Sequence, residues 1–260
     1  MESKPERLTL ISLNIERDRH LESRVIPFLR ERQPDVICLQ EVFGVDFKRL
    51  VDVLGMRGSH VPMMWQPTAR AERCGKWFES GLGVLSRPPN SRMRIEPYFG
   101  RPAEPVRMLR GEEKDGVWIW DQAAVKKMLL WTRVQKENTA FTIATTHFTW
   151  SAEGKADENQ RRDSVQLLKV LSGFEDVVLC GDMNAPRGGE IFSRFVAQYR
   201  DHIPPKYTTS IDGELHRAGQ LNIMVDGLFS TPRYEISDVE LVSGLSDHCA
   251  ITATVCRNVE

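Results

Sequence analysis

The sequence has no apolar run near the roughly 18 residues that a membrane-spanning helix needs. Its first fifteen residues lack the succession of basic, apolar and small residues that marks a secretory signal peptide. It also contains no internal repeat and no low-complexity tract. These absences favour a globular protein without a membrane anchor, and we expect it in the cytoplasm.

Cysteine is scarce, and neither sign of charge is in excess. The five cysteines are an odd number without a C-x-x-C pair, which speaks against a disulfide framework. Cys38 and Cys180 lie inside apolar runs, as is typical of reduced core thiols. With 35 basic and 36 acidic residues the net charge is −1, so no bulk field attracts nucleic acid or an anionic membrane. A local basic groove remains open.

The 260 residues suffice for a sizeable core, and we expect a single domain over residues 1–260. Strand-length apolar runs alternate with segments of helical spacing, and both hairpin turns and helices join the strands. Mixed sheets covered by helices are therefore expected. The predicted strands are 7–15, 35–42, 59–65, 81–86, 128–135, 140–147, 177–180, 221–230, 234–242 and 249–256, and the predicted helices are 21–32, 47–54, 157–174 and 190–199.

Residues 87–115 form one long segment without periodicity, and they are predicted to be an irregular loop. The segment contains five prolines, Pro88, Pro89, Pro97, Pro102 and Pro105. From residue 86 to residue 114 there are seven basic and four acidic side chains, a local charge of +3. Two interpretations stay open: a solvated loop, or a wall that brings arginines to substrate phosphates.

Polar residues end the apolar run VVLCGDMNAP, where Asp182 and Asn184 are separated by one position. In an extended chain such residues point the same way, so we expect both on one face at the end of a strand. Other strands carry polar side chains in the same manner. The full series is Asn14, Glu41, His147, Asp182, Asn184, Asp226, Asp247 and His248.

These residue types fit one chemistry. Glu41 and Asp182 are hard oxygen ligands suited to Mg²⁺ or Mn²⁺, and the two histidines can hold protons near neutral pH. Asp226 sits among apolar neighbours, where an unpaired charge is costly, and a histidine is its obvious partner. Carboxylates, amides and imidazoles around a divalent cation are what phosphoester hydrolysis requires.

The ordered set LNI, LQE, TTH, GDMN, VDGLF and SDH resembles the endonuclease/exonuclease/phosphatase superfamily, which has the deoxyribonuclease-I-like fold. The resemblance runs from Asn14 to His248. It implies an α+β fold, a four-layer α/β/β/α sandwich of two mixed β-sheets flanked by helices. It also implies hydrolysis of phosphoester bonds with a divalent cation, usually Mg²⁺, which Mn²⁺ can replace.

The same resemblance assigns roles to the residues that match its motifs. Glu41 would bind the metal, assisted by Asn14 and Asp247. Asp182 would orient or deprotonate the attacking water, and Asn184 would help to position it.

The two histidines receive roles from the resemblance as well. His248 would contact the scissile phosphate, with Asp226 holding its imidazole. His147 would stabilise the transition state or assist the leaving group. Which histidine acts as the general acid stays open.

The segment TTHFTW bears on the branch of the superfamily. Apurinic endonucleases carry a tyrosine there, so His147 indicates another branch. Phe148 and Trp150 are predicted to contact the substrate, and Glu79 is a weaker candidate for orienting His147.

The expected function is a Mg²⁺-dependent phosphodiesterase that acts on nucleic-acid ends or a related small phosphodiester. Two alternatives remain: an enzyme that acts on lipid head groups or inositol phosphates, and a binding module that retains the fold without activity. The expected partner is a phosphodiester substrate, with nucleic acid as one candidate. A monomer is expected, although the sequence does not fix the oligomeric state.

Overall fold

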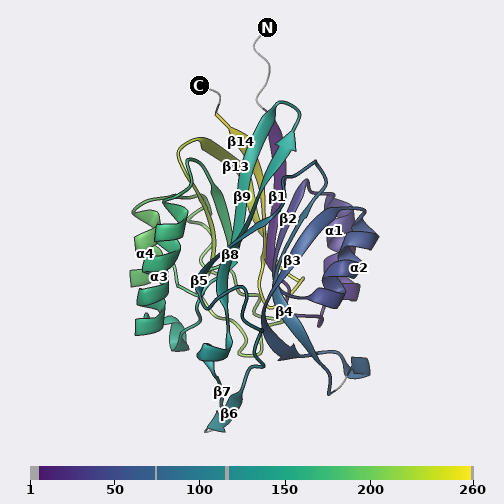
Figure 1. Ribbon diagram of the computed structural model, residues 1–260, viewed down its shortest axis with the longest axis vertical. Helices are drawn as coiled ribbons and strands as arrows, with labels where there is room; N and C mark the ends of the chain where they lie inside the picture. The colour runs from purple at the N-terminus through teal and green to yellow at the C-terminus, as the bar shows by residue number, and fades with distance from the viewer. Residues whose placement is uncertain (1–5, 74, 115–116, 259–260) are drawn as a thin grey trace.

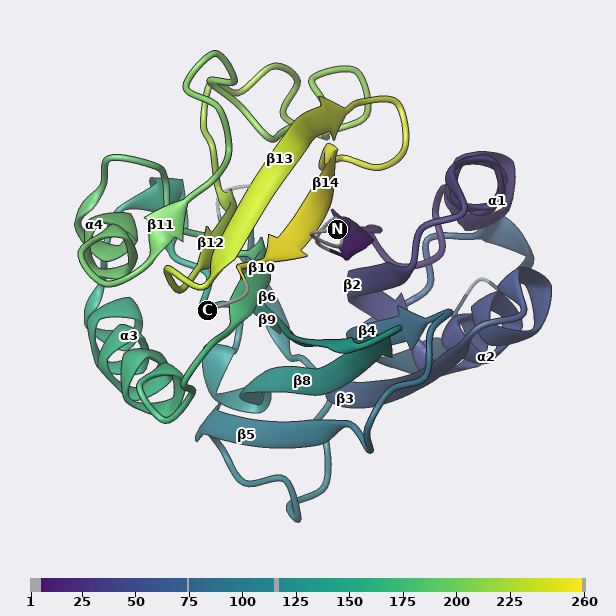
Figure 2. The same ribbon diagram turned by 90° about the horizontal axis from the view of Figure 1, so that it is seen from above.

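The computed structural model describes residues 6–73, 75–114 and 117–258. Two six-stranded sheets lie face to face, with helices on both outer sides (Figures 1 and 2). The first sheet has the order β13-β14-β1-β2-β4-β3. Its strands are β1 (Arg7–Asn14), β2 (Val36–Phe43), β3 (Arg57–Pro67), β4 (Trp77–Ser86), β13 (Tyr234–Val242) and β14 (Ala250–Arg257).

The second sheet has the order β11-β12-β10-β9-β8-β5. Its strands are β5 (Arg94–Phe99), β8 (Lys127–Lys136), β9 (Thr139–His147), β10 (Val178–Asp182), β11 (Arg200–Asp201) and β12 (Asp226–Ser230). Both sheets are mixed, because β1 runs parallel to β2 and β9 parallel to β10, while the other neighbours are antiparallel. The predicted α+β sandwich is confirmed.

Four α-helices cover the outer faces of the sheets in the described part of the chain. They are α1 (Ile26–Arg32), α2 (Gly44–Leu54), α3 (Glu158–Leu171) and α4 (Glu190–Val196). A π-helical turn, Leu21–Val25, leads into α1, and short 3₁₀ turns occur at Ala71–Arg73, Gln122–Ala124 and Ala152–Gly154. Figure 2 shows α1 and α2 beside the first sheet and α3 and α4 beside the second. Among the residues described, no helix has the length and apolarity to cross a membrane.

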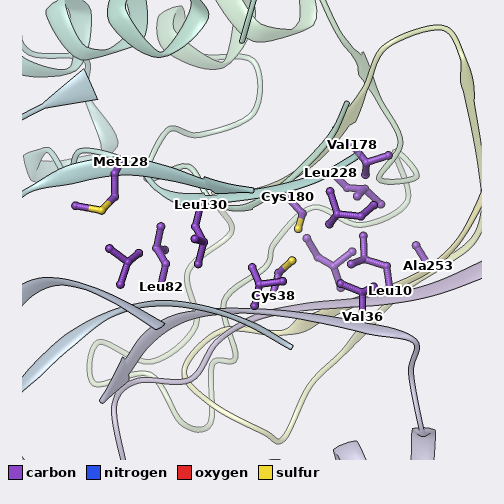
Figure 3. Close-up of a cluster of buried hydrophobic side chains, with 14 of the residues drawn as sticks. Leu10, Val36, Cys38, Leu82, Met128, Leu130, Val178, Cys180, Leu228 and Ala253 are labelled. Atoms are coloured by element: carbon purple, nitrogen blue, oxygen red, sulfur yellow. The ribbon is translucent and has the colours of Figure 1, made fainter. Parts of the chain in front are cut away.

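Strands buried on both faces explain the continuous apolar runs in the sequence. In β1, Leu10 packs between the sheets, whereas its neighbour Ile11 packs under the helices of the first sheet. Cys38 and Cys180 face one another in the inter-sheet core (Figure 3). Both are free thiols, as are Cys249 and Cys256, so the prediction of reduced core thiols holds for these four; Cys74 lies outside the described residues.

Two sequence predictions about segment boundaries are wrong. The segment 87–115 is not wholly irregular, because it contains β5 and also β6 (Gly111–Lys114), which pairs with β7 (Val117–Trp120) in a projecting hairpin (Figure 1). Pro97 is accommodated because β5 is an edge strand, where a missing N–H is tolerated, and the ladder is irregular there. The strand predicted over 221–230 begins only at Asp226.

Candidate active site

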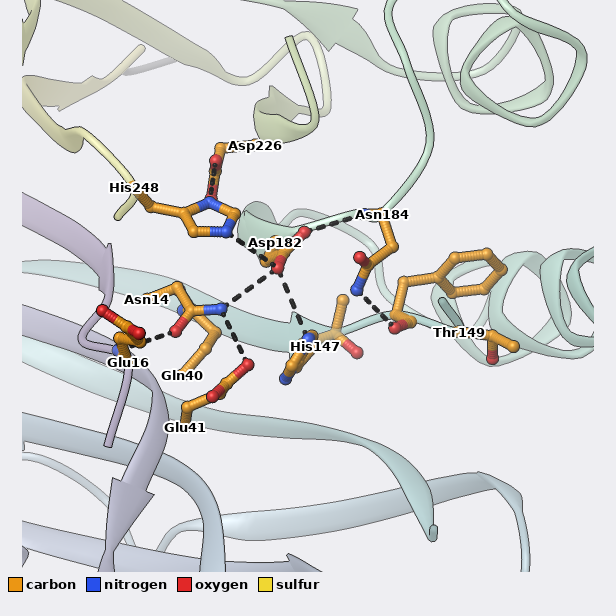
Figure 4. A network of polar contacts seen from close by, with 12 residues as sticks. Asn14, Glu16, Gln40, Glu41, His147, Thr149, Asp182, Asn184, Asp226 and His248 are labelled. Atoms are coloured by element: carbon orange, nitrogen blue, oxygen red, sulfur yellow. Dashed lines mark hydrogen bonds and ion pairs between the residues drawn. The ribbon is translucent and has the colours of Figure 1, made fainter. Parts of the chain in front are cut away.

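The site lies where the parallel pairs β1–β2 and β9–β10 end, because parallel strands bring their carboxyl ends to one edge of a sheet. Asn14 is the last residue of β1, His147 of β9 and Asp182 of β10. In the strand register, Asp182 lies opposite both His147 and Asp226. The two sheets therefore place polar residues from distant segments around one point (Figure 4).

Glu41 reaches this point through an irregularity in β2. The register between β2 and β4 shifts between Leu39 and Val42, and Glu41 has a φ of +55°. A glutamate in the left-handed region costs free energy and persists only where the surroundings enforce it. The amide nitrogen of Asn14 donates to Glu41 Oε1 (3.4 Å) and to Asp182 Oδ2 (3.1 Å), which joins the two carboxylates.

Asp182 and Asn184 do not share one face of an extended strand, as the sequence predicted, because the chain turns after Asp182. Gly181 has a φ of +137°, and a Cβ there would lie 2.1 Å from the Thr146 carbonyl oxygen, so only glycine fits. Asn184 has a φ of +46° and has left the strand, while its backbone N–H donates to Asp182 Oδ1 (2.8 Å). Its side-chain amide donates instead to the Phe148 carbonyl oxygen (3.1 Å). Asn184 thus braces the segment that follows His147.

His248 and Asp226 form an ion pair in the interior. The Nδ1 atom of His248 lies 2.7 Å from Asp226 Oδ2, and its Nε2 atom lies 3.7 Å from Asp182 Oδ2. Burial opposes a charged imidazole, but the carboxylates of Asp226 and Asp182 outweigh it and raise the pKa of His248 well above its usual range. His248 is therefore a cation at neutral pH.

His147 lies on the other side of the same carboxylate oxygen, with Nε2 3.4 Å from Asp182 Oδ2. Burial lowers the pKa of His147 well below its usual range, assisted by the charges of Lys127 and His248. Its Nδ1 atom is buried and has no hydrogen-bond partner among the residues that the structure describes. Asp182 itself has a pKa raised to about 7, chiefly by burial. One carboxylate is thus flanked by a charged and a neutral imidazole.

The donor set fits a hard divalent cation. Burial raises the pKa of Glu41, and the negative charge of Asp247 raises it further. Crowded carboxylates of this kind gain free energy when a cation neutralises them. Asp182, Asp226 and His248 also cluster, with ligand atoms within 4.8 Å of one another. Glu41 and Asn14, which are hydrogen-bonded to each other, offer further oxygen atoms at the same point.

Two sequence predictions about neighbouring residues are wrong. Phe148 is fully buried and packs against Tyr98 and Phe195, so it cannot contact substrate. The alternation of β9 explains this, because His147 points to the site and the next side chain points to the helices. Glu79 lines a cavity of about 800 Å³ beside α2, together with His60, rather than pairing with His147. Trp150, at 45% exposure, remains available to substrate.

Sequence reasoning missed three ionisable residues at the site. Glu16 and Arg17 follow Asn14 with φ values of +49° and +65°, and burial raises the pKa of Glu16 to about 7. Arg17 donates to the Pro67 carbonyl oxygen (2.9 Å) and its charge lowers the pKa of Glu41. Lys127 is buried behind His147. Two sequence features could have revealed these residues. Glu16 and Arg17 belong to a run of five ionisable residues directly after a predicted strand, and Lys127 begins an apolar strand.

Two face-to-face mixed sheets with this polar cluster at their joined ends define a protein of the deoxyribonuclease-I-like class. The family model described as "Endonuclease/Exonuclease/phosphatase family" matches residues 11–248, and the chain belongs to this family. Members of the family are phosphoester hydrolases and generally use a divalent metal.

Individual proteins agree with this assignment. The chain is 26% identical over 206 residues to Nocturnin of Drosophila melanogaster; the match covers 77% of this chain but only 27% of that protein. Two solved structures share the fold. One is an endonuclease/exonuclease/phosphatase family protein from Bacteroides thetaiotaomicron, with TM-score 0.72, 13% identity and 98% and 97% of the two chains covered. The other is the human Nocturnin catalytic domain with bound sulfate, with TM-score 0.70, 16% identity and coverages of 97% and 95%.

Proposed function

We propose that this protein is a Mg²⁺-dependent phosphodiesterase that acts on nucleic-acid ends or a related small phosphodiester. The observation that carries the proposal is the position of Asp182 Oδ2 between the charged His248 and the neutral His147. Hydrolysis of a phosphoester needs a proton acceptor for water and hydrogen-bond donors for the phosphate oxygens in one place. This arrangement supplies both.

Each side chain of the site has a separate role in the proposed reaction. Asp182, with a pKa near 7 in the absence of a cation, is suited to accept the proton of the attacking water, and Asn184 helps to position that water. The His248 cation binds a phosphate oxygen, and Asp226 holds its ring in orientation. His147 donates to the oxygen on which charge develops. A divalent cation held by Glu41, Asn14 and Asp247 would neutralise phosphate charge.

The substrate class rests on three further observations. The net charge of −1 disfavours a binder of long duplexes, which relies on many Lys and Arg contacts to phosphates. Trp150 is exposed three residues after His147 and offers a face on which a base can stack. The sulfate bound to the human Nocturnin domain supports recognition of a tetrahedral anion by this fold.

Four buried free thiols support a reducing, cytoplasmic setting.

A direct test compares hydrolysis of bis-p-nitrophenyl phosphate in Mg²⁺, Mn²⁺ and EDTA. We expect EDTA to abolish turnover and either cation to restore it. Glu41→Ala is expected to lower kcat by about 100-fold or more, whereas Glu79→Ala, which removes an exposed glutamate outside the site, leaves kcat unchanged. Metal-independent turnover, or full activity of the Glu41 variant, would contradict the proposal.

The substrate class is tested with a panel of labelled oligonucleotides, abasic duplex, 5′-tyrosyl ends, sphingomyelin and inositol phosphates. We expect turnover of oligonucleotide ends or tyrosyl ends in Mg²⁺. Turnover of sphingomyelin or inositol phosphates alone would replace the proposed substrate by a lipid head group or an inositol phosphate.

A further inference from the structure

Lys127, the first residue of β8, has its ammonium group in the interior of the protein behind the site. Its Nζ atom donates to the carbonyl oxygens of His147 (3.2 Å) and Phe148 (2.9 Å). Burial lowers the pKa of Lys127 to about 8, while the negative charge of Asp182 counteracts this. A lysine that is only 4% exposed is rare and needs partners for its donors.

The carbonyl oxygens that Lys127 holds belong to the junction of two site segments. The Phe148 oxygen also accepts from the Asn184 side chain (3.1 Å), and the Phe148 N–H donates to the Asp182 carbonyl oxygen (2.8 Å). The backbone of the single residue Phe148 therefore joins Lys127 to the ends of both β9 and β10. The paired register of β8 with β9 stops at Leu129 and Thr146, so these carbonyls lie beyond the ladder and depend on side-chain donors.

We propose that Lys127 is a positioning residue of the reaction: by holding the two carbonyls it fixes the His147 imidazole against Asp182 and aligns Asn184. The inference rests on the proposed function, which gives these three side chains their roles. A charge-assisted hydrogen bond is about twice as strong as a neutral one, so the lysine restrains this backbone more firmly than an amide would. Residues that orient the reacting side chains without touching the substrate typically contribute about 10- to 100-fold to activity.

The neighbouring residue provides a matched control. Lys126 is also buried, at 6% exposure, and its Nζ atom also donates to a carbonyl oxygen, that of Glu104. The Glu104 carbonyl lies in the segment between β5 and β6, and no described contact of Lys126 involves a site residue. Lys126→Met therefore removes the same kind of interaction without touching the site.

The first experiment compares Lys127→Met with Lys126→Met on bis-p-nitrophenyl phosphate in Mg²⁺. We expect Lys127→Met to lower kcat by about 10- to 100-fold with KM within about threefold, and Lys126→Met to keep the wild-type kcat. Lys127→Arg, which keeps the charge and the donors, should retain more activity than the methionine variant. Wild-type kcat in Lys127→Met, or an equal fall in Lys126→Met, would overturn the proposal.

The second experiment does not depend on activity. In metal-free protein labelled with ¹⁵N-histidine, we expect Lys127→Met to shift the ring resonances of His147 and to leave those of the distant His60 unchanged. If Lys127→Met does not fold, Lys127→Gln is measured instead, with the same expectation. An unchanged His147 spectrum refutes the positioning role. If the wild type hydrolyses no phosphoester yet the His147 shift occurs, the proposed function fails while the positioning of His147 stands.

Discussion

Asp226 Oδ2 lies 2.7 Å from His248 Nδ1, deep in the protein, and this contact decides the protonation state of the imidazole. The Asp226 side chain is only 3% exposed and that of His248 only 11%. Without the carboxylate, burial alone would favour the neutral ring. The pair therefore keeps a cation next to Asp182, where the function proposed above requires a phosphate group to bind.

Replacing Asp226 by asparagine keeps the shape but removes the charge. We expect Asp226→Asn to lower the pKa of His248 and to reduce kcat by about 100-fold or more, with little change in Mg²⁺ affinity measured by calorimetry. The control is Asp201→Asn, since Asp201 lies in β11, beside β12, and pairs with Arg187 rather than with a site residue. An unaltered rate in the Asp226 variant would mean that this residue does not serve His248.

Glu41 should lower the stability of the metal-free protein and should be required for stabilisation by Mg²⁺. Glu41→Gln removes a buried carboxyl group whose pKa is raised by burial. In EDTA we therefore expect the variant to be as stable as wild type, or more stable by up to about 1 kcal/mol in unfolding free energy. In wild type, Mg²⁺ at 100 times its Kd should add about 2.7 kcal/mol, and in the variant almost nothing. Urea unfolding with and without Mg²⁺ measures both effects. Equal stabilisation of the two proteins by Mg²⁺ would exclude Glu41 as a ligand.

Phe148 and Trp150 should respond oppositely to truncation. Phe148→Ala empties a fully buried aromatic position, and we expect a loss of about 3–5 kcal/mol in unfolding free energy. Trp150→Ala changes an exposed side chain, so stability should change by less than about 1 kcal/mol while KM for an oligonucleotide rises. The two variants serve as controls for each other. A KM unaffected by Trp150→Ala would remove this residue from the substrate site.

His60 gives the fold a defined sensitivity to acid. Burial lowers the pKa of His60 to about 4, and its Nε2 atom hydrogen-bonds the Val42 carbonyl oxygen at 3.0 Å. The unfolded chain, with a histidine pKa near 6.5, binds the proton first, so stability is retained above about pH 6.5 and is lost as the pH falls toward 4. The slope is about 1.4 kcal/mol per pH unit.

His60→Gln keeps a donor for the Val42 carbonyl but does not titrate. We expect the variant to lose less stability than wild type between pH 6.5 and 5, measured by urea unfolding. His202, whose pKa burial also lowers to about 4, still titrates in both proteins and leaves a residual slope. Parallel stability curves for the two proteins would show that His60 is solvated in the native state.

Much of the fold could be predicted from local pattern. Apolar runs of strand length marked nearly every strand of the two sheets, because strands covered on both faces need apolar residues at every position. The pattern failed at β5, where Pro97 reads as a strand breaker but sits on an unpaired edge. An edge position is a property of the assembled sheet, so no local signal reveals it.

The site shows the same division. The sequence by itself determined that Asn14, His147 and Asp182 end strands, because a polar side chain after a buried strand is recognisable from its neighbours alone. It also marked Asp226 and His248, which lie instead at or before the beginning of a strand. Only the tertiary structure decided that Glu41 reaches the site through a distorted strand and that Lys127 lies behind His147 and donates to its carbonyl oxygen. The physical reason is that these properties depend on strand register and on contacts between segments far apart in the chain, which exist only once the two sheets have packed together.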